Sequence, residues 1–168
     1  VATSPIVSPQ DAAGSRAADR MTRPWTWGLR SMAVYLRIDE RGNPHLSGDR
    51  RVLQWGSGSV PTLRLVWSGA NNSYRAQAFS ASGTAVAVSP AGVPGVGDTV
   101  ELLFLCEVED GALRLRLMQS VDGGPITDSG WSGTVPADFD PTMFYVGSRD
   151  GGNDPSVLAV RDLLVLDG

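Results

Sequence analysis

Hydrophobic and polar residues alternate along most of the chain, in short runs separated by glycine, proline and asparagine. Side chains that recur at every second position lie on one face of a β-strand, whereas a helix needs a period of about 3.6 residues. No long stretch of this sequence has the helical period. The pattern therefore predicts strands at 31–38, 51–55, 62–67, 74–79, 84–88, 99–108, 113–118, 144–149 and 157–166.

Two turn signals indicate which of these strands pair. Asp110-Gly111 is a favoured two-residue hairpin turn, so it predicts that 99–108 and 113–118 form an antiparallel hairpin. Asn71-Asn72 separates the strands at 62–67 and 74–79 and predicts a second hairpin there.

The hairpin around Asp110 has an outer face that is only partly polar. Alternation places Val100, Leu102, Phe104, Cys106 and Val108 on one face, and it places glutamates opposite Arg114 and Arg116 on the other face. Leu103 and Leu105 fall on that outer face too. We therefore expect another strand, a loop or a second subunit to cover these two leucines.

Composition narrows the class of protein. The chain has 168 residues, of which 42% are apolar and 19% charged, and this suits a single globular domain. Short strands with scattered glycine and proline are typical of an all-β sandwich or barrel. The net charge of −4 disfavours a nucleic-acid partner. No run approaches the ~18 apolar residues of a membrane span, so we expect no membrane insertion.

The residue counts also exclude several chemistries. Cys106 and His45 are each the only residue of their type, and there is no lysine, so the chain has no intrachain disulfide, His/Cys zinc site or Schiff-base lysine. A catalytic triad would need His45, which stands in a turn-rich stretch. Glu107 and Glu109 share a strand face beside a turn and suggest a solvated strand end. We expect no enzymatic activity and no resident cofactor.

The C-terminal part of the chain resembles laminin-G-like, concanavalin A-like jelly-roll domains. Residues 100–116 (VELLFLCEVEDGALRLR) are similar to that family's strand, Asp-Gly turn and strand. Residues 145–149 (YVGSR) resemble its Ile-Gly-Gly strand, and 160–167 (VRDLLVLD) resemble its closing strand. The resemblance implies an all-β, antiparallel two-sheet jelly-roll sandwich.

The opening of the chain resembles a junction found in bacteriophage tail-fibre, tail-tip and head-spike proteins. The matching residues are 3–6 (TSPI) and 14–19 (GSRAAD). The resemblance implies a connector at 1–20 followed by a laminin-G-like jelly-roll domain at 21–168. Because no methionine begins the chain, we expect a processed chain or a fragment of a longer one. An ordinary N-terminal arm is the alternative interpretation.

Laminin-G-like domains often bind calcium at their loop rims, so acidic loops become candidates for a calcium site. Calcium needs several oxygen ligands, which Asp150, Asn153 and Asp154 offer in one loop. Asp138 and Asp140 offer two more. Tight turns select the same residue types, so turn formation is the alternative interpretation.

Sugar binding needs an exposed aromatic ring for the apolar face of a pyranose, with polar groups nearby for its hydroxyls. Trp131 is flanked by Ser and Gly and is the best exposed candidate among five tryptophans. Tyr74 with Arg75, beside the Asn71-Asn72 turn, and Asn153 are further candidates. Packing in the core or at an interface is the alternative for each aromatic residue.

Together these features predict a non-enzymatic adhesion module of a phage or phage-like particle, located on the particle surface. Its expected partners are other particle proteins and a host surface glycan. The alternative is a carbohydrate-binding module of a secreted bacterial enzyme.

We also predict self-association as a homotrimer, because the resembled fibres and spikes are commonly trimeric and one symmetric interface would cover Leu103 and Leu105. Light scattering should give a trimer mass for the wild type and a monomer mass for Leu103→Glu. A wild type that stays monomeric at high concentration would contradict this prediction.

Overall fold

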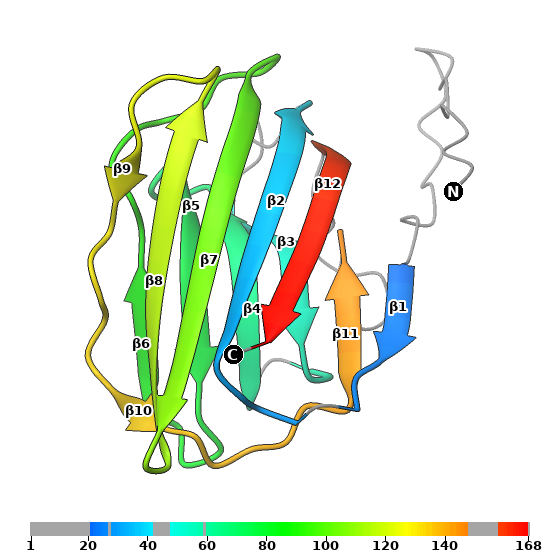
Figure 1. Ribbon diagram of the computed structural model, residues 1–168, viewed down its shortest axis with the longest axis vertical. Coiled ribbons are helices and arrows are strands. Elements are labelled where there is room, and N and C mark those ends of the chain that lie inside the picture. The colour runs from blue at the N-terminus through cyan, green and yellow to red at the C-terminus, as the bar shows by residue number, and fades with distance from the viewer. Residues whose placement is uncertain (1–20, 27, 42–47, 59, 148–157, 168) are drawn as a thin grey trace.

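The computed structural model describes residues 21–26, 28–41, 48–58, 60–147 and 158–167 (Figure 1). These residues form two antiparallel sheets packed face to face, each with six strands. In order across the first sheet, the strands are β1 (Met21–Pro24), β11 (Met143–Val146), β3 (Asp49–Trp55), β4 (Thr62–Ser68), β5 (Ser73–Phe79) and β6 (Ala85–Val88). In the second sheet they are β10 (Val135–Pro136), β8 (Ala112–Val121), β7 (Thr99–Glu109), β2 (Met32–Glu40) and β12 (Leu158–Asp167), with β9 (Thr127–Asp128) paired to β8.

Both predicted hairpins are confirmed. β7 and β8 pair from Val100↔Val121 to Glu109↔Ala112, and Asp110 and Gly111 between them both have positive φ, of 49° and 74°. Positive φ at both central residues gives the turn a twist that matches the twist of the flanking strands. β4 and β5 pair as far as Ser68↔Ser73, and Asn72 in their turn has a φ of 47°.

The core lies between the two sheets. The face of β7 that alternation predicts as apolar is buried from Val100 to Cys106, and Leu63, Leu65 and Trp67 of β4 are buried opposite it. Aromatic rings join the layers, because Trp55 of the first sheet lies 5.8 Å from Phe104 of the second, between ring centroids. Burial of these side chains is the main source of stability in a sandwich of this kind.

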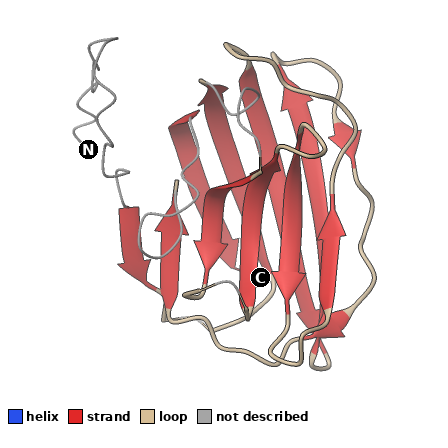
Figure 2. Cartoon of the chain, turned by 180° about the vertical axis from the view of Figure 1, so that it is seen from behind, coloured by secondary structure: helices blue, strands red, loops and turns tan. Residues whose placement is uncertain are grey.

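The all-β antiparallel sandwich predicted from the sequence is confirmed, and Figure 2 shows the two layers from behind. The described residues contain no helix, and hence none long and apolar enough to cross a membrane. The predicted connector at 1–20 lies outside the described residues, so the division into connector and domain stays a prediction.

The structure adds strands that the alternation did not predict. β9 and β10 have two residues each and pair with the edge of β8, so they are too short to show a period. β1 ends at Pro24 and lies at the edge of the first sheet, where a missing amide costs no ladder bond.

One buried polar contact offers a test of the core. The hydroxyl of Tyr74 donates a hydrogen bond to the carboxylate of Glu40, and both residues are 0% exposed. Tyr74→Phe removes this bond inside the core, so urea unfolding should show a loss of about 1–3 kcal/mol. Tyr35→Phe is the matched control, because the bond from Tyr35 to Glu101 is only part-buried. The control should lose less than about 1 kcal/mol, and equal losses would contradict the argument.

Candidate ligand-binding face

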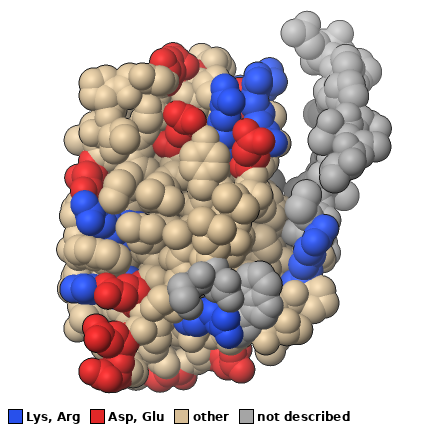
Figure 3. All heavy atoms as spheres, in the orientation of Figure 1, with Lys and Arg blue, Asp and Glu red and all other residues tan. Residues whose placement is uncertain are grey.

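The outer face of the second sheet carries two largely apolar rows that run across four strands. We define the outer face as the side chains of β8, β7, β2 and β12 that point away from the core. The strand register places Met118, Leu103, Tyr35 and Leu164 in one row, and Arg116, Leu105, Ala33 and Leu166 in the next. Figure 3 shows the result, a face with a largely uncharged centre and charged residues near its margins.

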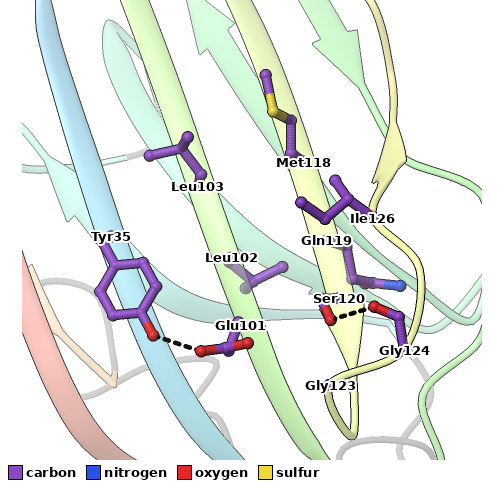
Figure 4. Close-up of a pocket in the computed structure, with 10 residues that line it drawn as sticks. All are labelled: Tyr35, Glu101, Leu102, Leu103, Met118, Gln119, Ser120, Gly123, Gly124 and Ile126. Carbon is purple, nitrogen blue, oxygen red and sulfur yellow. Dashed lines mark hydrogen bonds between the residues drawn. The ribbon is translucent and has the colours of Figure 1, made fainter.

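A groove lies over the first row, and Figure 4 shows its lining. This Tyr35 groove has a volume of about 380 Å³, and Leu103, Met118 and Ile126 form its apolar part. Polar groups gather at one end, where the Tyr35 hydroxyl donates to Glu101 Oε1 at 2.7 Å. The bond to this carboxylate raises the pKa of Tyr35, so its hydroxyl stays protonated at neutral pH.

A second groove, of about 310 Å³, lies over the next row beside Trp131. We call it the Trp131 groove, and its apolar lining includes Ala33, Leu105 and Leu166. The guanidinium carbon of Arg114 lies 4.7 Å from the centroid of the Trp131 ring, and that of Arg116 lies 5.8 Å from it. Cations at these distances attract the ring, so they hold it in place while 39% of the residue stays exposed.

Two serines attach the Trp131 loop to the edge of β8. Ser129 Oγ accepts a hydrogen bond from the Leu117 amide at 2.9 Å, and Ser132 Oγ accepts one from the Leu115 amide at 2.9 Å. The amides of both serines also donate back to β8, at 3.0 and 2.8 Å. The small residues around Trp131 therefore fix its backbone on both sides and leave the ring projecting.

Ion pairs anchor the two arginines under the ring. Arg114 pairs with Glu107, and Arg116 makes a bidentate contact with Asp128, with Nε 3.0 and 3.2 Å from its two oxygens. The Arg114 hydrogen bond lowers the pKa of Glu107. The Arg116 bond and then the Gly130 amide lower the pKa of Asp128 to about 2. Both carboxylates are therefore ionised at neutral pH.

Trp131 is the only predicted sugar-binding residue that the described structure places on this face. Tyr74 is a correction, because it is 0% exposed and its ring packs edge-on against Trp67 in the core, at 5.2 Å between centroids. Its ring is thus not available to a surface ligand. Arg75 lies on β5 in the first sheet, so the pair is not brought together with Trp131. Asn153 lies outside the described residues.

Of the predicted calcium ligands, too, some lie among the described residues and others lie outside them. Asp150, Asn153 and Asp154 lie outside the described residues, so this site stays a prediction. Asp138 accepts hydrogen bonds from the Ala81 and Ser82 amides, at 2.7 and 3.1 Å, and so joins two loops. Among the residues that the structure describes, no group of three metal-ligating side chains occurs.

Leu103 and Leu105 are partly buried within one chain, because the side chains that line the two grooves surround them. The oligomeric state stays a prediction.

Three side chains of the Tyr35 groove, those of Tyr35, Met118 and Ile126, were not predicted from the sequence. Alternation in 31–38 does place Tyr35 on the outer face, so the signal for Tyr35 was present.

A row of polar side chains on the first sheet was also not predicted. In this row, Arg64 Nε donates to Gln77 Oε1 at 2.6 Å, and the side-chain amide of Gln54 donates to the Gly56 carbonyl at 2.9 Å. The side chains of Arg64, Gln77 and Gln54 are buried. Their hydrogen bonds join β4 to β5 and join Gln54 to the turn after β3.

No family model and no curated protein sequence matches the chain. Solved structures share its fold. A heptameric SAP-like pentraxin from Limulus polyphemus aligns with a TM-score of 0.52 and 13% identity, over 87% of this chain and 67% of the pentraxin. The GH43 protein BlXynB (mutant K247S) from Bacillus licheniformis aligns with a TM-score of 0.52 and 12% identity, over 83% of this chain and 28% of that protein.

A Trypanosoma rangeli sialidase in complex with 2,3-difluorosialic acid also aligns, with a TM-score of 0.50 and 17% identity. The alignment covers 82% of this chain and 20% of the sialidase. This chain therefore spans less than a third of the GH43 protein and of the sialidase. At these identities the likeness concerns the β-sandwich fold alone.

The Asp128–Arg116 pair gives the face a pH dependence that can be measured. Because the pKa of Asp128 is lowered from 3.8 to about 2, the pair contributes stability above about pH 4 and loses it as the pH falls towards 2. Asp128→Asn should therefore be less stable than the wild type at neutral pH, and the difference should disappear in this acid range. Urea unfolding at a series of pH values measures both.

The control is the same substitution in an Arg116→Gln background, where no pair is left to titrate. There the pH-dependent difference should be smaller, because only the Gly130 amide is left to lower the pKa of Asp128. A difference that persists unchanged at low pH in the wild-type background would count against the ion pair as its cause.

Proposed function

We propose that the chain is a non-enzymatic glycan-binding module and that a sugar stacks on Trp131. The observation that carries this proposal is Trp131 itself, a residue that is 39% exposed and whose ring is anchored on an open, largely apolar face. An aromatic ring with a polar surround suits a pyranose, which has apolar C–H faces and a rim of hydroxyls. Arg114 lies 4.7 Å from the ring centroid and its partner Glu107 lines the same groove, so both can offer hydrogen bonds to such hydroxyls.

Binding without catalysis fits the electrostatics of the face. A general acid in glycoside hydrolysis needs a carboxyl group whose pKa is raised, so that it carries a proton at the working pH. The arginines beside Glu107 and Asp128 lower the pKa of both carboxyls. These two groups are therefore suited to accept hydrogen bonds and unsuited to donate a proton.

We further propose that the module belongs to a phage or phage-like particle, where it would contact other particle proteins and attach to a host surface polysaccharide. The resemblance of residues 3–6 and 14–19 to a phage junction supports this assignment. A carbohydrate-binding module of a secreted bacterial enzyme is the second candidate. A preceding jelly-roll and a particle-anchoring segment in the full gene would favour the particle, and a catalytic domain would favour the enzyme.

Substitution of Trp131 tests the proposed function. We expect the wild type to bind at least one purified bacterial capsular or cell-wall polysaccharide on an array, and calorimetry to give its affinity. Trp131→Leu removes the ring but keeps an apolar side chain, so binding should weaken about tenfold, equivalent to about 1.4 kcal/mol. Trp131→Phe keeps a smaller ring and should retain part of the affinity.

The matched control is Val60→Ser, which changes a side chain that is 51% exposed and lines neither groove. It should bind as the wild type does. Failure of the wild type to bind any polysaccharide, or equal binding by Trp131→Leu, would overturn the proposed function.

A further inference from the structure

We propose that the ligand is an uncharged, extended oligosaccharide that lies along β7 and fills the Trp131 groove and the Tyr35 groove together. This inference rests on the proposed function and specifies the class of glycan. It follows from the adjacency of the two grooves on β7 and from the partners of the charged side chains that line them.

The two grooves are neighbours on one strand. Leu103 lines the Tyr35 groove and Leu105 lines the Trp131 groove, and both point outward from β7. Together the linings extend along β7 from Glu101 to Glu107. Six residue steps of a strand span about 20 Å. A single sugar ring is shorter than this, so a ligand that fills both grooves is a chain of several sugars.

The charged side chains that line the two grooves or lie beside the Trp131 ring each have a partner within the chain. Glu101 accepts a hydrogen bond from the Tyr35 hydroxyl, Glu107 forms an ion pair with Arg114, and Asp128 forms one with Arg116. A uronate or sialate would have to compete with these carboxylates for the arginines, and it would also be repelled by them. A neutral sugar leaves each pair intact and needs hydrogen bonds only at its hydroxyls.

The lining also suits a ligand with alternating apolar and polar surfaces. In the Trp131 groove, Trp131 and Leu105 offer apolar contact. In the neighbouring Tyr35 groove, the apolar contact is continued by Leu103, Met118 and Ile126. Beyond that row, the Glu101 carboxylate and the Ser120 hydroxyl provide polar groups at the far end of the Tyr35 groove.

An array of defined oligosaccharides tests the inference with the full chain. It carries neutral glucan, mannan and galactan oligomers, from single sugars to progressively longer chains, beside counterparts that contain uronic or sialic acid. We expect binding to neutral oligomers that tightens by about tenfold or more with length, until both grooves are filled. The acidic counterparts should bind more weakly.

The Ile126→Asp variant tests the contribution of the Tyr35 groove separately from that of the Trp131 groove. Ile126 is 71% exposed, so the substitution should leave the fold intact while it places a charge at the edge of the Tyr35 groove. The gain in affinity with length should disappear, and the binding of short oligomers at Trp131 should persist. Val60→Asp, which lines neither groove, should keep the length dependence.

The remaining outcomes distinguish a failure of this inference from a failure of the proposed function. Preference for acidic oligomers, absence of a length effect, or a length effect that survives Ile126→Asp would overturn the inference. The proposed function would still stand if Trp131→Leu weakened binding in those cases. Loss of self-association in Ile126→Asp, with no oligosaccharide bound by the wild type, would instead assign the face to a second copy and would overturn both.

Discussion

The register between β7 and β8 is the constraint on which the rest of the structure depends. One face of this hairpin places Phe104 and Leu117 in the core, and the other face places Leu103 and Met118 in the Tyr35 groove. Because side chains alternate strictly, a slip of one residue would exchange the two sets and expose the core residues. The Asp110-Gly111 turn fixes this register, since its backbone closes the hairpin with no extra residue. Core packing and the candidate binding face are therefore set by the same two strands.

The edge of β8 illustrates how stability and the proposed function share one feature. An uncovered strand edge presents free amides and carbonyls that can pair with another chain. Here Ser129 and Ser132 use backbone and side-chain groups to cover the edge at Leu115 and Leu117. The same bonds hold the backbone on either side of Trp131, so its ring projects over Arg114 without a regular element of its own. A loop that protects the sheet thus also presents the ring.

Much of the fold could be predicted from alternation and turn residues, and the failures have physical causes. The hairpins at Asn72 and Asp110 were predictable because turn geometry selects the residue types locally. The prediction for Tyr74 was wrong because nearness to a turn does not determine exposure, whereas the position of a side chain in the strand register does. It pairs with Trp67 across β4 and β5, and both side chains are buried on the core face. Exposure of Trp131 was predictable from its small neighbours, but its contact with Arg114 depends on a loop path that no period encodes.

Charge pairing links the rigidity of the face to the ligand that it suits. Arg116 and Asp128 hold each other in a bidentate contact that restricts both side chains, and a platform restricted before binding loses less entropy when a ligand arrives. The same pairing occupies Arg116 and Asp128, so the proposed affinity comes from ring stacking, apolar contact and hydrogen bonds to hydroxyls. Such contacts are individually weak and gain strength by repetition along a chain. A long shallow face with one anchored ring is therefore better matched to an extended neutral polymer than to a small charged molecule.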